Sequence, residues 1–376
     1  MSYFRLFTFI LSIFVVGMVE LVVAGILTLI AKDLHISNAL AGQLVTLYAF
    51  TFAVCGPLLV KLTEKYNAKN VLLITMVIFI IGNALNAAGT TFFIIVLGRI
   101  IASAAASLIV VKILALTVVL SQPEVRGKML GLVYIGFSGA NVFGVPIGTW
   151  LGELFGWRAT FWLIVAVSVF ATLLLMLQLP KNIQTSTEED KTSELLYPKE
   201  AIKYISITFL LLSANAAVFT YISPIMMEHG YTLEQVSVAL FVAGIGSMTG
   251  TSFGGSMTDK LGSKRWLLIA ITTFTIVLLI FNFVLPAFLV LLMVILIWNL
   301  SEWSTNPAVQ MGIIKQVKGD TSGIMAWNMS ALNAGIGFGA MLGGFMIAQG
   351  FHATTTTYLA AGLSFVCILI ALSIKR

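Results

Sequence analysis

The feature that most constrains this chain is the repetition of continuous apolar runs, separated by loops that contain charged residues, Gly, Pro or Asn. A helix needs roughly 20 apolar residues to cross the hydrocarbon core of a bilayer. Hydrophobic residues make up 59% of the chain and charged residues only 10%, whereas a soluble domain carries about 25% charged residues. Because the runs do not alternate with polar residues, a membrane β-barrel is excluded. The sequence therefore predicts an all-α protein that crosses a membrane many times.

The 376 residues accommodate twelve spans in two sets of six. The first set is expected near residues 6–31, 39–61, 70–90, 92–119, 128–152 and 158–180, and the second near residues 201–227, 235–257, 265–284, 286–313, 322–348 and 354–374. The first run is too long for a signal peptide and lacks a small-residue cleavage pattern, so it is interpreted as a span. Residues 181–200 form the most polar stretch. They are predicted to be a cytoplasmic linker between a domain of residues 1–180 and a domain of residues 201–376.

The positions of the basic residues indicate an orientation. Cytoplasmic loops of membrane proteins carry an excess of Lys and Arg. If the N-terminus lies inside, seventeen of the 21 basic residues fall in inner segments, whereas only Lys32 and Arg158 fall in outer loops. We therefore expect a multi-pass protein of the cell membrane with both termini in the cytoplasm.

The two sets of spans resemble each other at an offset of about 195 residues. Residues 64–67 match residues 259–262, and residues 156–160 lie opposite residues 350–354. A six-helix unit that is repeated about an axis along the membrane normal is a known transporter plan, with the substrate site between the halves. Two pseudo-symmetric six-helix bundles are therefore predicted.

Three motifs carry a resemblance to a known family. The loop after the predicted eighth span contains a motif of glycines, an acidic residue and basic residues, namely Gly255, Asp259, Lys260, Gly262, Lys264 and Arg265. Its copy after the second span is degenerate, with Val60 in place of the first glycine, Glu64 for the aspartate, then Lys65 and Asn67. The fourth span opens with Leu97, Gly98 and Arg99. The fifth span carries a glycine and proline motif, formed by Gly136, Gly139, Gly144, Pro146 and Gly148.

With these motifs, the chain resembles the major facilitator superfamily over essentially its whole length. The stretch from Gly17 to Leu34 looks like the first span of bacterial drug:proton antiporters that include arabinose-efflux and purine-efflux proteins, with Thr28 where a proline is common. The fifth-span motif is characteristic of antiporters in this family. The resemblance implies export of a small organic solute, such as a purine base, a nucleoside or a drug-like compound. It also implies rocking of two halves, a proton gradient as the energy source and a conformational role for the loop motifs.

Four ionisable residues are expected inside the spans: Glu20 in span 1, Arg99 and Lys112 in span 4, and Glu302 in span 10. A charge at the bilayer centre costs at least about 2.5 to 3.5 kcal/mol, so each needs compensation. The family resemblance places spans 1, 4, 7 and 10 around a central cavity. All four charges are thus expected on cavity-forming helices.

Glu20 and Glu302 are candidate proton carriers, because desolvation disfavours the charged form of a carboxyl. The alternative for Glu20 is a fixed ion-pair or hydrogen-bonding role between spans. Arg99 stays charged at any accessible pH, so it can act on a carboxylate but cannot carry the proton. The alternative for Arg99 is hydrogen bonding to local backbone. Lys112 is either a pairing residue or snorkels to the cytoplasmic face.

Trp298, Glu302 and Asn306 recur every four residues and share one helix face. An aromatic ring beside a carboxyl and an amide would suit an aromatic or heterocyclic solute. The alternative is that the tryptophans pack or lie at an interface and that Pro307 kinks the helix. Lys112 and Trp303 are further candidate substrate-binding residues. So are isolated polar residues that are as often interhelical glue, namely Tyr48, Asn141, Asn215, Tyr221, Asn328 and Asn333.

Signals of soluble enzymes are absent from the sequence. There is no Walker-type loop, and the Gly244-Ile-Gly246 stretch has no strand before it. The histidines have no metal-ligand spacing, and the two cysteines lie in apolar runs near opposite ends of the chain. We expect no enzyme activity, metal, cofactor or nucleic acid, and a monomer that contacts solute, protons and lipid. A symporter or facilitator for a solute such as a sugar is the main alternative, and a membrane sensor or enzyme is a remote one.

Overall fold

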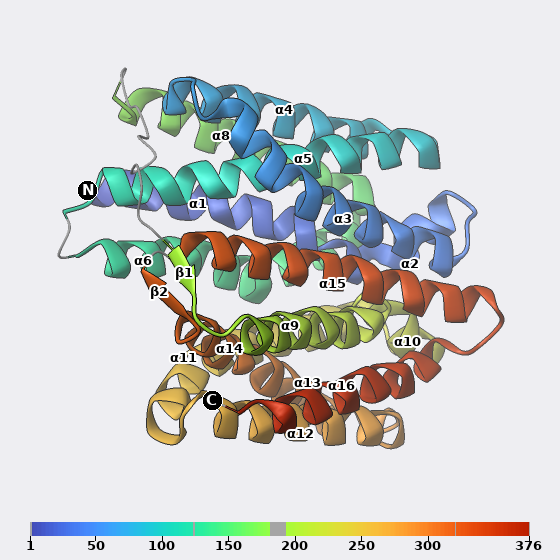
Figure 1. Ribbon diagram of the computed structural model, residues 1–376. Helices are drawn as coiled ribbons and strands as arrows, with labels where there is room; N and C mark the ends of the chain where they lie inside the picture. Colours follow the sequence, from blue (N-terminus) through green and yellow to red (C-terminus); the bar gives the residue numbers. More distant parts are fainter. Residues whose placement is uncertain (1, 123–124, 181–192, 320, 376) are drawn as a thin grey trace.

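The computed structural model describes residues 2–122, 125–180, 193–319 and 321–375 (Figure 1). Twelve helices in these ranges are long and apolar enough to cross a membrane. This confirms the predicted all-α membrane fold with twelve spans. Residues 181–192, which make up most of the expected linker, lie outside the described residues.

The first six spans comprise α1 (Tyr3–Leu21), α2 (Val23–Asp33), α3 (Asn38–Thr63), α4 (Ala68–Ala88), α5 (Phe92–Val119), α6 (Arg126–Gly139), the π-helix η2 (Ala140–Gly144), α7 (Val145–Phe155) and α8 (Trp157–Gln178). The other six comprise α9 (Pro198–Phe219), α10 (Ile222–Glu228), α11 (Leu233–Leu261), α12 (Ser263–Val284), α13 (Phe288–Trp303), α14 (Thr305–Ile314), α15 (Ser322–Ala348), the short 3₁₀ helix η3 (Ala353–Thr355) and α16 (Thr356–Ser373). Two short strands, β1 (Ser193–Leu195) and β2 (Val317–Gly319), complete the described elements.

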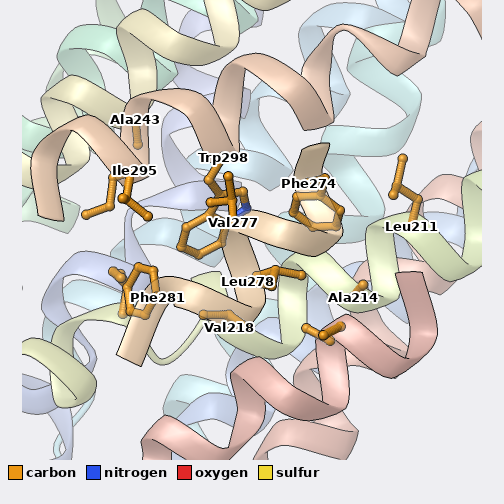
Figure 2. Packing of buried hydrophobic residues seen from close by; sticks show 14 of the residues in the cluster. Leu211, Ala214, Val218, Ala243, Phe274, Val277, Leu278, Phe281, Ile295 and Trp298 are labelled. Atoms are coloured by element: carbon orange, nitrogen blue, oxygen red, sulfur yellow. The ribbon is translucent and has the colours of Figure 1, made fainter. Parts of the chain in front are cut away.

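The helices form two groups that follow the chain order. In Figure 1 most of α1–α8 lie in the upper part and most of α9–α16 in the lower part, while the labelled termini share the left side. One buried apolar cluster includes Phe9, Leu72 and Phe161, and the other includes Leu211 and Phe274 (Figure 2). We call residues 1–180 the first half and residues 193–376 the second half. The end of the helix bundle at which the two termini lie is called the termini side, and the opposite end is called the far side.

Four of the spans are interrupted, which the apolar pattern did not indicate. The breaks lie at Val22 in the first span, at η2 in the fifth, at Thr220 and Tyr221 in the seventh, and at Ser304 in the tenth. In the tenth span the reason is local, because Pro307 has no N–H to donate to the carbonyl four residues earlier. Each interruption leaves backbone groups that must find partners within the protein.

The repeat of about 195 residues reappears in the hydrogen bonds at the termini side. Lys69 Nζ donates to Leu179 O at 2.6 Å, and Lys264 Nζ donates to Ile374 O at 2.5 Å. In each pair the two residues are 110 positions apart, and the second pair follows the first by 195 positions. Each ammonium group satisfies a carbonyl just after the last helix of its half, where the helix dipole favours a positive charge. Lys264, expected to belong to a conformational motif, thus caps α16 in this structure.

The strand pair β1 and β2 was not expected from the sequence. Leu195 pairs with Val317 in an antiparallel register, and Leu196 N donates to Gln316 O at 2.8 Å. The end of the expected linker is therefore attached to the connection between α14 and α15. This places the polar segment before α9 against the second half.

Glycines bring α11 close to the tenth span. A Cβ added at Gly246 would lie 2.7 Å from Leu296 O, and one at Gly250 would lie 2.5 Å from Leu300 O. Backbones approach this closely only where a residue has no side chain. Gly255, in contrast, has open space around its Cβ position. The first glycine of the expected loop motif is thus not required for packing in this conformation.

A polar cluster joins three far-side connections of the first half. Arg158 Nη1 donates to Asp33 Oδ2 at 2.5 Å, and Arg158 Nη2 donates to Gly89 O at 2.9 Å. Trp157 Nε1 also donates to Asp33 Oδ2, at 3.2 Å. The hydrogen bond from Arg158 holds the pKa of Asp33 below its usual range, and the bond from Trp157 acts in the same direction.

We predict that Gly250→Ala destabilises the protein by about 1–3 kcal/mol, because the added methyl group meets the backbone of the tenth span. Thermal unfolding of the purified protein in detergent measures this effect. Gly255→Ala, on the same helix, is the matched control and should be neutral or slightly stabilising. Equal melting temperatures for the two variants would contradict the packing argument.

We predict that the Asp33 carboxylate stabilises the folded protein above pH 4 and loses this effect in acid. The folded pKa is lowered, so the contribution is complete above the unfolded value of about 3.9 and disappears as the pH falls through the folded value. The difference in melting temperature between the parent protein and Asp33→Asn should therefore shrink between pH 6 and pH 3. A difference that does not change with pH would refute the electrostatic explanation. Both side chains are partly exposed, so the effect should be small.

Candidate transport site

Arg99 is the centre of a polar cluster in the first half. It lies on α5 and is completely buried. Its Nη1 donates to Val19 O at 2.8 Å and its Nε donates to Leu44 O at 3.3 Å. These bonds connect α5 with α1 and α3 through backbone carbonyls. The alternative in which Arg99 bonds to backbone therefore describes part of the role of Arg99 in this structure.

Tyr48 on α3 packs against the Arg99 guanidinium. The carbon of the guanidinium lies 4.2 Å from the centroid of the tyrosine ring, a cation–π distance. Ser103 Oγ, one turn further along α5, donates to the carbonyl of Tyr48 at 2.5 Å. Tyr48 is 1% exposed. Tyr48 is thus fixed by α5 on both its ring and its backbone.

Glu20 lies beside this pair on α1 and is half-buried. Arg99 is close enough to attract its carboxylate. Within the described ranges no residue donates a hydrogen bond to that carboxylate. Glu20 lies two residues before the break at Val22. A partly accessible carboxyl is therefore held opposite a buried cation at a helix interruption.

Glu302 is the buried carboxyl of the second half. It is 2% exposed, and its Oε2 is buried without a hydrogen-bond partner. No Lys or Arg of the described chain forms an ion pair with it. It lies two residues before the break at Ser304, and its carbonyl accepts a bond from Thr305 Oγ1 at 2.6 Å. The two carboxyls predicted to carry protons thus both precede a helix interruption, but only Glu20 has a cation nearby.

Trp298 is packed into the core of the second half rather than presented to a ligand. Its ring makes edge-on contacts with Phe219 and Phe281, with centroids at 6.4 Å and 5.6 Å. Trp298 and Phe281 are labelled in Figure 2. Its Nε1 donates to Asn215 Oδ1 at 2.8 Å. With 1% of the residue exposed, no face of the ring is open in this conformation. The packing alternative describes Trp298 here, and a stacking role would require another conformation.

The remaining candidates of the second half are dispersed. Trp303 and Asn306 are half-buried, so the face that Asn306 shares with Trp298 and Glu302 becomes more accessible only after Glu302. Asn328 Oδ1 accepts a bond from Thr208 Oγ1 at 2.7 Å, which joins α15 to α9. Asn333 is buried and keeps its Oδ1 without a partner. Asn328 thus acts as interhelical glue in this conformation.

Lys112 and the loop motifs lie toward the termini side. Lys112 Nζ donates to Thr63 O at 3.4 Å and is attracted by Glu64. It therefore lies at the end of α3, next to the degenerate motif copy, rather than beside Glu20. The remaining motif side chains that face solvent are Lys65, Asp259, Lys260 and Arg265.

The fifth-span glycines pack within their own half. A Cβ at Gly136 would lie 2.5 Å from Ile10 O, and one at Gly148 would lie 2.5 Å from Val22 Cγ2. Gly144 is also close to α1, while Gly139 makes only ordinary contacts. The glycines thus join the fifth span to the first span. Contacts with the other half come from other residues of η2 and α7.

Hydroxyl and amide groups connect the two halves. Asn141 Nδ2 in η2 donates to Ser247 Oγ in α11 at 2.8 Å. Nearer the far side, Ser237 Oγ donates to Pro146 O at 2.9 Å. Asn141 was predicted to bind substrate, and here it bridges the halves.

The first and seventh spans meet at the far side. The hydroxyls of Thr28 and Ser223 lie 3.0 Å apart, and these residues are separated by 195 positions. They are therefore equivalent residues of the repeat that meet each other. Leu27 and Ala31 of α2 belong to the buried cluster of the second half. Neither Thr28 nor Ser223 was predicted to be functional, although the repeat offset would have paired them.

Tyr221 lies in the same far-side contact region between the halves. Its hydroxyl donates to Ala340 O at 2.9 Å, and its ring occupies the space beside Gly42 and Gly343. A Cβ added at Gly42 would lie 2.5 Å from the Tyr221 ring. Tyr221 was expected to bind substrate, but it is completely buried where α3, α9 and α15 meet. We call this region, with Thr28 and Ser223, the far-side seal.

The two halves carry different groups on an equivalent scaffold. Asn215 follows Glu20 by 195 residues, and Trp298 follows Ser103 by the same interval. The first half therefore holds a charged cluster where the second half holds an amide and an indole. Such an arrangement offers an acidic group, a buried cation and aromatic surface at the level of the helix breaks.

Comparison with known proteins agrees with this architecture. The family model of the Major Facilitator Superfamily matches residues 9–324 and, in a second match, residues 205–376. The chain is 28% identical to the uncharacterized MFS-type transporter YbcL of Bacillus subtilis over 358 residues, which cover 93% of this chain and 90% of the relative. It is 27% identical to the inner membrane transport protein YdhP of Escherichia coli, with 90% of this chain and 87% of the relative covered.

A third relative carries a more specific name. The chain is 26% identical to a probable sugar efflux transporter of Helicobacter acinonychis, over 92% of this chain and 88% of that protein. The twelve spans and the family match together identify the protein as a multi-pass membrane transporter of small solutes rather than an enzyme. This chain belongs to the Major Facilitator Superfamily.

Proposed function

We propose that the protein is a proton-coupled antiporter that exports a small organic solute from the cytoplasm. The observation that carries the proposal is the pair of carboxyls at helix interruptions, one in each half. Glu20 is half-buried beside Arg99, and Glu302 is buried without an ion pair to any described residue. A carboxyl without a compensating charge in a membrane is stable as the neutral acid or with a cationic ligand.

The orientation of the chain supports the proposed direction of transport. Most basic residues lie on the termini side, which favours a cytoplasmic location for the termini. The far-side seal then separates Glu20 from the outside, because Leu27 and Ala31 lie about two and three turns beyond it on the same span. The partly exposed Glu20 carboxyl would be reached from the cytoplasm in this conformation. This arrangement suits loading of an exporter.

The cycle would couple the two carboxyls to opening of the seal. Solute from the cytoplasm binds between the halves and displaces protons from Glu20 or Glu302. Rocking of the halves opens the far-side seal and closes the termini side. Protonation from outside then favours solute release and the return.

The solute is proposed as a small neutral or cationic compound. The purine-efflux resemblance of the first span favours nucleobases and nucleosides. The name of the Helicobacter relative supports including sugars. Symport and facilitated diffusion are the alternatives. They are distinguished from antiport by how a proton gradient changes the flux of the solute.

We predict that proteoliposomes with an acidic lumen accumulate the solute through protein whose cytoplasmic face points outward. A panel of nucleobases, nucleosides, sugars and cationic drugs identifies it. Glu20→Gln and Glu302→Gln should each lower gradient-driven flux by about tenfold or more, which corresponds to roughly 1.4 kcal/mol. Glu153→Gln is the control, because Glu153 is exposed on α7.

The outcomes separate the candidate functions. Flux of the solute that is independent of the pH gradient would indicate a facilitator, and flux in the same direction as protons would indicate a symporter. Full gradient-driven flux in both glutamate variants would show that neither carboxyl is needed for coupling.

We predict that a cross-link at the far-side seal stops transport. Thr28 and Ser223 touch through their hydroxyls, so cysteines at both positions should react with a short bifunctional reagent. Cys55 and Cys367 are first replaced by Ala. Cross-linking should abolish flux, and a cleavable reagent should restore it after cleavage. Unchanged flux through the cross-linked protein would mean that these residues need not separate.

A further inference from the structure

Two buried donors in the first half have no acceptor. The Tyr48 hydroxyl and Arg99 Nη2 are buried and make no hydrogen bond within the described part of the chain. A buried polar group without a partner costs about 1–3 kcal/mol, and such groups are rare in folded proteins. Both belong to side chains that pack against each other at 4.2 Å.

One acceptor beside them has no donor. The Glu20 carboxylate receives no hydrogen bond from the described residues, although Arg99 lies within electrostatic reach. Arg99 Nη1 already binds the carbonyl of Val19, the residue before Glu20. The number and chemistry of the unpaired groups are complementary, since a carboxylate accepts several hydrogen bonds.

The donors are fixed and the acceptor is the group able to move. Ser103 and Arg99 on α5 hold Tyr48 by its carbonyl and its ring. Glu20 is half-buried on α1 next to the break at Val22. Rotation of its side chain would bring the carboxylate to the donors.

The charged groups around Tyr48 can be named element by element. Glu20 on α1 and Arg99 on α5 act on its hydroxyl. Of the other helices packed on α3, α15 carries no titratable residue, while α2 carries Lys32 and Asp33 at its far-side end, where Asp33 is bound to Arg158. Glu20 and Arg99 are thus the ionisable groups of the described helices that act on the Tyr48 hydroxyl.

We propose that Tyr48 is a positioning residue that, together with Arg99, receives the deprotonated carboxylate of Glu20. The inference rests on the proposed function, in which Glu20 exchanges protons. The present conformation is the released position, in which the half-buried Glu20 accepts no hydrogen bond from the described residues. In the docked position the Tyr48 hydroxyl and Arg99 Nη2 both donate to the carboxylate. Tyr48 thereby sets the pH at which Glu20 takes up its proton.

Tyr48→Phe tests this proposal because it keeps the ring against Arg99 and removes only the hydroxyl. Difference infrared spectroscopy of the purified protein follows protonation through the carboxylic acid band that Glu20→Gln removes. The pH at which this band is half-developed should rise by about one unit in Tyr48→Phe, because a hydrogen bond to the charged form is lost. Tyr134→Phe on α6 is the control and should leave it unchanged.

Transport measured in the same variants separates the inference from the function. In Tyr48→Phe the pH profile of flux should move with the infrared midpoint. An infrared midpoint equal to that of the parent protein overturns the role of Tyr48, whatever the transport result. A shifted midpoint with flux that ignores the proton gradient would support docking and overturn the coupled function.

Discussion

The arrangement of the first half depends on a completely buried guanidinium. In place of water, the guanidinium of Arg99 contacts the carbonyls of Val19 and Leu44 and the ring of Tyr48. A charge in a membrane needs such compensation, and each of these partners belongs to a different helix from Arg99. Satisfying the arginine therefore fixes α1 and α3 relative to α5. The position of Glu20 follows from this constraint, because it is attached to the α1 backbone that Arg99 holds.

The second half uses the same scaffold with different chemistry. Asn215 occupies the place of Glu20, and its amide is bound by Trp298, which fills the core among Phe219 and Phe281. The carboxyl of this half, Glu302, is left without a cation. Two halves with equivalent helices thus provide one carboxyl with a cation nearby, Glu20, and one without an ion pair to the described residues, Glu302. This asymmetry would allow protonation to act on one half more than on the other.

The contacts between the halves combine polar groups with close backbone packing. The far-side seal consists of hydroxyl contacts and of Tyr221 against glycines. Close backbone approaches occur within a half, as at Gly250 against Leu300, and also between the halves, where a Cβ added at Gly244 would lie 2.5 Å from Val142 Cα. Polar contacts between the halves contribute little individually and can be exchanged for others. Rocking of the halves would have to separate the Gly244 contact as well as these polar contacts.

Much of the fold could be predicted because hydrophobic length and charge act locally along the chain. The twelve spans follow from apolar runs that must cover the membrane, and the repeat offset found in the sequence recurs in the capping of α8 and α16 by Lys69 and Lys264. The break at Val22 and the strand pair β1 and β2 were missed, because they depend on packing and on partners distant in sequence. The break at Ser304 agrees with the alternative in which Pro307 kinks the tenth span, because its cause is local.

The candidate site could be predicted only in part. Glu20, Arg99 and Glu302 stood out because an ionisable residue inside an apolar run is costly wherever it lies. The sequence by itself determined the fold class, the two related halves and these buried charges. Only the tertiary structure decided which charges have partners, that Trp298 and Tyr221 are packed and that Thr28 meets Ser223. The physical reason is that burial cost belongs to a residue and its span, whereas compensation depends on which helices come together in space.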